Sequence, residues 1–201
     1  MNLDFTLEKY RALCQVLQDT ACEVMTLAHF LQAGQPHCRI VILRHDVDRA
    51  LACALRMAEF EASVGLNATY YFRMQPSVFS PPAIQHIHRL GHEVGYHYET
   101  LTKARGDYQQ ALTLFAQELA RFREVSPVDT ISMHGSPLSR WDNRDLWRAY
   151  DLGEYRVSEA YISVDYSDMY YFTDTGRCWD AGRHNVRDRV ASLKPNRQVH
   201  T

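Results

Sequence analysis

Hydrophobic and polar positions along the chain follow two periods, one typical of helices and one typical of buried strands. Apolar residues recur at helical spacing over residues 6–17, 50–63, 82–90 and 107–124. Short apolar runs bounded by polar residues cover residues 39–43, 67–73, 93–98 and 130–133. Strands that alternate with helices in this order predict an α/β fold with a mainly parallel sheet or barrel.

The two ends of the chain extend this pattern. Residues 1–35 form a helical lead-in, and residues 39–43 predict the first central strand, buried on both faces. Short runs over 161–164 and 169–172 predict two later strands. The basic tail, about 183–201, lacks an apolar period, so we expect it to be loosely held. With 201 residues, 46% of them hydrophobic, the chain can bury one core, which predicts a single domain.

Titratable residues stand at the ends of three predicted strands. Asp46 and Asp48 follow the first strand, and a spacing of two points both carboxylates to the same side. His97 ends the strand over 93–98, and His134 follows the strand over 130–133. The carboxyl ends of parallel strands are where α/β proteins place their active sites. One carboxylate of such a pair can bind a cation while the other accepts a proton from water.

Each of these residues also has a structural explanation. Asp46 or Asp48 could cap the following helix, and a lone histidine is usually a satisfied polar residue. Two carboxylates fit the capping role poorly, because burying unpaired charge costs several kcal/mol. Three other histidines lie on or just after the helix over 82–90, at the amino end of the next strand, and are expected at the surface: His86, His88 and His92.

Composition excludes some classes of partner. A formal net charge of -2 gives no field that would gather nucleic acid or an anionic membrane, and we expect neither as a partner. No apolar stretch approaches the roughly 20 residues that span a bilayer. The five cysteines are scattered without the spacing of a zinc or redox motif, which predicts reduced thiols in a cytoplasmic protein.

Three motifs resemble those of the polysaccharide deacetylase family. RHDVD (44–48) is similar to its first motif in the D-x-D form, GHEVGYH (91–97) to its second, and MHGSPLS (133–139) to a divergent third. The resemblance spans residues 39 to about 180. It implies a distorted (β/α) barrel of fewer than eight repeats. It also implies a divalent cation, first of all Zn²⁺, and hydrolysis of an N- or O-acetyl group on a sugar or glycan.

Carried over position by position, the resemblance makes Asp46 the catalytic base and makes Asp48 and His97 metal ligands. The family's second motif supplies another histidine four residues after the first, but Leu101 stands there. We therefore expect His134 to be the third ligand, with Glu99 as the alternative and extra water as the last resort.

Two further family features have only partial counterparts. The arginine that holds the base in the family's third motif is missing, and Arg44 or Arg177 could replace it. The late segment TDTGRCWD (173–180) resembles the polar and aromatic wall of the family's site, although a turn with a core tryptophan explains it equally well. The residues that the resemblance adds to the site are Asp174 and Arg177 beside the base, and Trp179, Ser136 and Tyr98 against the substrate.

The family's late histidine, its general acid, has no match, since His184 and His200 lie outside any strand-like run. We therefore expect the fold to be incomplete at its C-terminus. The same departure leaves open a catalytically silent carbohydrate-binding protein. A serine esterase with Ser136 as nucleophile is a weaker alternative, because the G-x-S-x-G elbow is missing and Pro137 removes a backbone donor.

Overall fold

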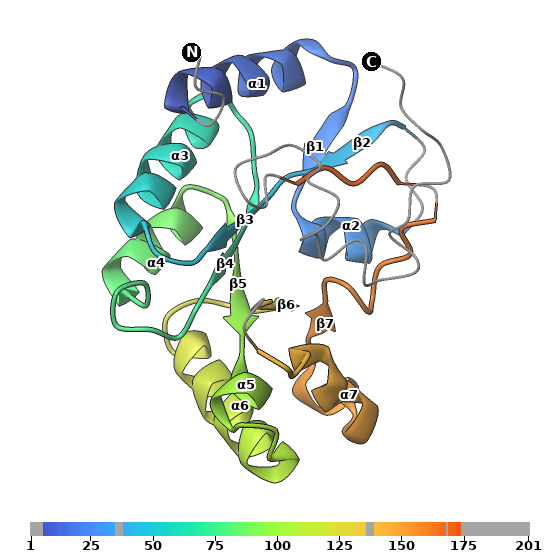
Figure 1. Ribbon diagram of the computed structural model, residues 1–201. Coiled ribbons are helices and arrows are strands. Elements are labelled where there is room, and N and C mark those ends of the chain that lie inside the picture. Colours follow the sequence, from blue (N-terminus) through green and yellow to red (C-terminus); the bar gives the residue numbers. More distant parts are fainter. Residues whose placement is uncertain (1–5, 35–37, 136–138, 168, 174–201) are drawn as a thin grey trace.

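A parallel sheet of five strands forms the centre of the protein, with the strands side by side in chain order (Figure 1). The computed structural model describes residues 6–34, 38–135, 139–167 and 169–173. The strands of the sheet are β3 (Arg44–Val47), β4 (Thr69–Phe72), β5 (Glu93–Tyr98), β6 (Thr130–Met133) and β7 (Ser158–Glu159). Each neighbouring pair is parallel, so the expected α/β fold with a parallel sheet is confirmed.

Helices connect successive strands and lie on the outer side of the sheet (Figure 1). They are α3 (Leu51–Ser63), α4 (Pro81–Arg89), α5 (Thr100–Lys103) and α6 (Tyr108–Arg123), followed by η1 (Asn143–Asp145), α7 (Leu146–Ala149) and η2 (Leu152–Tyr155). The lead-in helix α1 (Leu7–Asp19) begins where the Thr6 hydroxyl accepts the Lys9 amide at 3.2 Å, and it lies beside α3. Within the described ranges, no helix combines the length and apolar character needed to cross a membrane.

The prediction for residues 39–43 is wrong in one respect. The apolar run forms β2 (Ile40–Ile42), which is half-buried and pairs in parallel only with β1 (Glu23–Met25) in a separate two-stranded sheet, with α2 (Leu27–Ala33) between them. After β2, only Leu43 separates the chain from the first strand of the central sheet. The motif residues themselves therefore form the first central strand, β3.

The two late strands expected over 161–164 and 169–172 are not formed in the described residues. The sheet instead ends at β7, which is only two residues long. Immediately after it, the Glu159 carboxylate accepts the backbone amides of Tyr161 at 2.7 Å and Ile162 at 3.0 Å. These bonds turn the backbone away from the direction of a strand.

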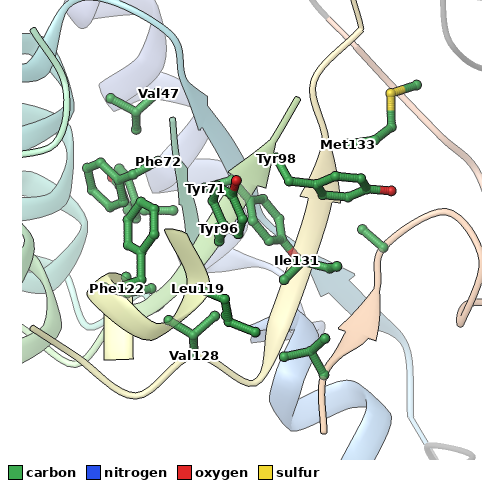
Figure 2. Close-up of a cluster of buried hydrophobic side chains, with 14 of the residues drawn as sticks. Val47, Tyr71, Phe72, Tyr96, Tyr98, Leu119, Phe122, Val128, Ile131 and Met133 are labelled. Carbon is green, nitrogen blue, oxygen red and sulfur yellow. The ribbon is translucent and has the colours of Figure 1, made fainter. Parts of the chain in front are cut away.

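The two faces of the sheet differ in polarity because successive strand residues point to opposite sides. Aromatic side chains such as Tyr96 cover the outer face and pack against Leu119 and Phe122 of α6 (Figure 2). The inner face carries polar side chains. It is also tightly packed, since a β-carbon on Gly95 would lie 2.3 Å from the ring of Tyr71. Only glycine fits there, and Tyr71 reaches across it to bond Thr130 at 2.8 Å.

Candidate metal centre

Three side chains from the ends of three strands meet on the inner side of the sheet. Asp48 follows β3, His97 lies in β5, and His134 follows β6. One ligand atom from each lies within 4.8 Å of the other two. Asp48 Oδ1 is 3.7 Å from His97 Nε2 and 3.3 Å from His134 Nε2. The structure thus brings together the three residues that the sequence predicted as metal ligands.

The His97 ring is oriented for metal binding. Its Nδ1 lies 2.9 Å from the Ser132 carbonyl oxygen, which can only accept, so Nδ1 carries the proton and Nε2 presents a lone pair. Burial lowers the pKa of His97 below its ordinary value, even though neighbouring Asp46 acts in the opposite direction. The imidazole is therefore neutral at physiological pH, which is the form that binds metals.

Asp48 has an unused ligand atom. Its Oδ1 is buried and has no hydrogen-bond partner among the described residues, and the nearest imidazole nitrogen is His134 Nε2 at 3.3 Å. Burial alone would raise the pKa of Asp48, but His134 and His97 outweigh it, so the carboxyl pKa lies below its usual value. This carboxylate oxygen, which receives no hydrogen bond from the described residues, lies beside two imidazoles. Together they form a set of three ligand atoms that fits a divalent cation such as Zn²⁺ with an open coordination position.

Asp46 is held beside this cluster by Arg44. The Arg44 Nη2 group donates to both Asp46 oxygens, at 3.0 and 2.9 Å, and also to Ser132 Oγ and Tyr161 OH. Asp46 Oδ2 lies 3.9 Å from His97 Nε2, and the side chain remains 34% exposed. Burial alone would raise the pKa of Asp46, but Arg44 and His97 together lower it by more. The pKa therefore lies below its usual value, and the carboxylate is ionised at neutral pH.

Glu99, the alternative third ligand, lies behind His134 and outside the group of converging donors. Arg73 donates to both of its oxygens, at 3.3 and 2.6 Å, and Gln75 donates to Oε1 at 3.2 Å. Glu99 Oε2 lies 3.6 Å from His134 Nδ1, on the side of the ring that faces away from Asp48.

The other residues considered for the site lie away from the three converging side chains or outside the described residues. Leu101 is 1% exposed and belongs to the core. Tyr98, expected against the substrate, is fully buried, since it points to the face opposite His97, where Trp147 Nε1 donates to its hydroxyl at 2.9 Å. The expectation for Tyr98 is therefore wrong. The remaining predicted site residues lie outside the described residues: Ser136, Asp174, Arg177 and Trp179.

Some residues that support the site were not predicted. Asn143 is buried and joins two ligand-bearing segments, because its amide donates to the His134 carbonyl at 2.9 Å and accepts the Thr102 amide at 3.0 Å. Tyr161 holds Arg44 at 3.0 Å. Arg73 had a signal in the sequence, since it ends the strand predicted over 67–73 and the candidate ligands also lie at strand ends. Asn143 and Tyr161 had none.

A second titratable cluster lies on the outer face of β3 and β4. Glu61 accepts hydrogen bonds from His45 at 2.7 Å, from the Tyr70 hydroxyl at 2.7 Å and from Tyr10. His92 accepts the Ala68 amide at Nδ1, at 3.1 Å, and donates from Nε2 to the Ala58 carbonyl at 2.9 Å. The expectation that His92 lies at the surface is wrong, because it is 2% exposed and satisfies backbone groups in the core.

Searches of protein-family models, curated proteins and solved structures found no match to this chain. The arrangement of Asp46 beside Asp48, His97 and His134 is therefore the observation from which a function can be inferred. Such a site can hold a cation and accept a proton next to it, which is the requirement for metal-assisted hydrolysis.

Proposed function

We propose that this protein is a metal-dependent hydrolase that removes an N- or O-acetyl group from a carbohydrate. The observation that carries the proposal is the position of Asp46, an ionised and partly exposed carboxylate beside three converging metal donors. The acetyl group and the sugar are taken from the similarity of RHDVD, GHEVGYH and MHGSPLS to polysaccharide deacetylase motifs.

Asp48, His97 and His134 would hold the cation. Two imidazoles and one carboxylate favour Zn²⁺ over Ca²⁺ or Mg²⁺, which prefer sites made of oxygen ligands. A bound Zn²⁺ supplies a Lewis acid that polarises a carbonyl group and makes a nearby water easier to deprotonate.

Asp46 acts as the general base of this proposal. Its two oxygens are fixed by one guanidinium group, and its open side allows a water molecule to reach it. Arg44 is itself fixed by Ser132 and Tyr161, and its guanidinium lies 5.2 Å above the Tyr71 ring. The base is therefore positioned before a substrate binds, which reduces the entropic part of the barrier.

We also propose that the five-stranded sheet belongs to a distorted (β/α) barrel with fewer than eight repeats. Two properties of the sheet support this. The strands follow one another in chain order without a reversal, and ionisable groups gather at their carboxyl ends on the inner face. An open doubly wound sheet would instead reverse its strand order near the site.

The test is acetate release by the Zn²⁺-loaded protein from N-acetylated glucosamine oligosaccharides and from O-acetylated sugars. In Asp46→Asn, turnover should fall by about 10²–10⁴-fold, as expected for loss of a general base, while the zinc content stays that of the wild type. Asp129→Asn is the matched control, since Asp129 is exposed next to the amino end of β6, and it should keep full activity.

Two results would contradict the proposal. An Asp46→Asn protein as active as the wild type would exclude Asp46 as the base. Stoichiometric binding of the oligosaccharide by the Zn²⁺-loaded wild type without any acetate release would instead favour a carbohydrate-binding protein that is catalytically silent.

A further inference from the structure

We infer that Glu99 is a positioning residue that fixes the ring of His134 for metal binding, an inference that rests on the metal site of the proposed function. The His134 ring lies between two carboxylates. Its Nε2 is 3.3 Å from Asp48 Oδ1, and its Nδ1 is 3.6 Å from Glu99 Oε2. A carboxylate behind a ligating imidazole orients the ring and increases its basicity toward the metal.

Glu99 is held too firmly to act as a ligand itself. Arg73 donates to both oxygens, Gln75 adds a third bond, and Lys103 Nζ lies 3.6 Å from Oε1. The side chain is only 9% exposed. To reach the converging donors, the carboxylate would have to leave three hydrogen bonds in a buried position. It is therefore fixed on the far side of the His134 ring.

The two histidines use different groups for the same purpose. His97 Nδ1 bonds to a backbone carbonyl, that of Ser132, whereas His134 Nδ1 faces the Glu99 carboxylate. The His134 backbone is separately fixed by Asn143, which donates to its carbonyl oxygen at 2.9 Å. With the backbone fixed, rotation of the ring is the freedom that Glu99 removes.

Arg73 links Glu99 to the other carboxylate of the site. Its Nη1 lies 3.9 Å from Asp48 Oδ1, while Nη2 binds Glu99 Oε2 at 2.6 Å. One guanidinium thus lies between the two carboxylates that flank His134. This arrangement keeps the negative charges apart on opposite sides of the imidazole.

The chain offers a matched pair of variants for a test. Glu99 and Glu118 are each 7% exposed, and each lies within 3.6 Å of Lys103 Nζ, but only Glu99 contacts a metal ligand. Zn²⁺ affinity would be measured by competition with a chromophoric chelator for the wild type, Glu99→Gln and Glu118→Gln. We expect Glu99→Gln to bind Zn²⁺ about 10–100-fold more weakly, and Glu118→Gln to remain close to the wild type.

The absorption spectrum of the Co²⁺-loaded proteins adds a signature that a structural effect would not produce. The bands should shift in Glu99→Gln without losing intensity, because His134 stays a ligand but becomes less basic. A loss of intensity would indicate a missing ligand and would overturn the positioning role. Glu99→Asp, which keeps the charge but shortens its reach, should show the same weakening should Glu99→Gln fail to fold.

Failure of this inference can be separated from failure of the proposed function. If Asp48→Asn weakens Zn²⁺ binding but Glu99→Gln binds as tightly as Glu118→Gln, the metal site stands and the role of Glu99 is wrong. If the wild type does not bind Zn²⁺, or if Asp48→Asn binds it unchanged, the metal site of the proposed function is wrong.

Discussion

Two clusters with the same chemical groups lie on opposite faces of one sheet. The inner cluster consists of Asp48, His97 and His134, and the outer cluster consists of Glu61, His45 and His92. In the outer cluster, hydrogen bonds engage the Glu61 carboxylate and both ring nitrogens of His92. In the inner cluster, Asp48 Oδ1 accepts no hydrogen bond from any described residue, and His97 Nε2 lies 3.7 Å from Asp48 Oδ1 and 3.9 Å from Asp46 Oδ2.

The difference lies in how completely each cluster satisfies its own polar atoms. A satisfied buried network contributes to stability and has no lone pair left for a ligand. An unsatisfied buried network costs stability, and its unpaired polar atoms remain available to bind a ligand. The identity of the residues is therefore a weaker guide to function than their hydrogen bonding. Changes in the outer cluster should lower the free energy of unfolding, and changes in the inner cluster should lower metal affinity.

The largest effect is expected from Glu61→Ala. This change removes the shared acceptor of His45, Tyr70 and Tyr10 in a fully buried position. Removing one partner of a buried charged network typically costs about 3–5 kcal/mol in the free energy of unfolding. Urea denaturation of the zinc-free protein measures it. If the variant lost Zn²⁺ affinity while unfolding like the wild type, the outer cluster would not be the stabilising one.

The next largest effects are expected from one histidine variant in each cluster, each of which should change a different property. A structural zinc site binds with about 10–16 kcal/mol over four ligands, or roughly 2.5–4 kcal/mol per ligand. His97→Gln should therefore weaken Zn²⁺ binding by roughly 10²–10³-fold. His92→Gln should leave that affinity unchanged and instead lower stability by about 1–3 kcal/mol, because it disturbs two buried backbone bonds. Calorimetric zinc titration measures the Zn²⁺ affinity of both variants, and urea denaturation measures their stability. Equal losses of Zn²⁺ affinity in the two variants would refute the prediction.

Much of this comparison could be predicted from the sequence where the signal is local. Helical spacing and branched runs predicted the elements from α3 to β6 with small errors at their ends, apart from the short helix α5, which was not predicted. Asp48, His97 and His134 were predicted as site residues because each stands at the carboxyl end of a predicted strand, and the family resemblance assigned Asp48 and His97 to a metal. Leu101 was also correctly excluded as a ligand, since it is an apolar residue that the structure buries.

Two of the errors come from contact between distant segments, and a third comes from a side chain that binds the backbone two and three residues further along. Nothing near residues 39–43 in the sequence reveals that β2 pairs with β1 rather than with the central sheet. His92 lies in the core because Ala58 of α3 and Ala68, just before β4, supply its partners from 34 and 24 residues away. The aromatic run after β7 has the composition of a strand, yet the Glu159 carboxylate binds the amides that a strand would use.

Glu159 is a buried carboxylate that, within the described part of the chain, is hydrogen-bonded by backbone amides and by Tyr98 rather than by an imidazole. It is fully buried, and burial raises its pKa from 4.5 to about 7, although the amides of Tyr161 and Met133 favour the ionised form. Burial alone would raise the pKa of Glu61, but His45 and the hydroxyls of Tyr10 and Tyr70 together outweigh it, so this pKa lies below its usual value. The pKa values of two buried glutamates thus shift in opposite directions, according to whether the groups that favour the ionised form outweigh burial.

The sign of the resulting pH dependence follows from proton binding. Between pH 4.5 and about 7, folded Glu159 holds a proton that the unfolded chain has lost, so stability falls as the pH rises. The shift is equivalent to about 3 kcal/mol. Glu159→Gln lacks this titration and should gain up to about 3 kcal/mol relative to the wild type between pH 5 and pH 8. Urea denaturation at both pH values measures the gain, and identical pH profiles for the two proteins would exclude it.

The smallest expected effect concerns Arg44, which is connected to the inner cluster through Asp46, the proposed base. Arg44→Lys keeps the charge, but an ammonium group cannot reproduce the contacts of Nη2 with Asp46, Ser132 and Tyr161. Losing one charged hydrogen bond costs about 1.5–3 kcal/mol, so acetate release should fall by roughly 10–100-fold. Zn²⁺ affinity should not change, because Arg44 does not contact Asp48, His97 or His134 directly in the described structure.

Arg123→Lys provides the matched control for this prediction. Arg123 also donates from one Nη2 group to several oxygens, the carbonyls of Val128, Tyr155 and Arg156, but on α6 and away from the base. It should lower stability without changing turnover. If Arg44→Lys released acetate at the wild-type rate, Asp46 would not need to be held in place. If Arg44→Lys instead lost Zn²⁺ affinity, base and ligands would act as one unit, and the division of the two aspartates into base and ligand would have to be abandoned.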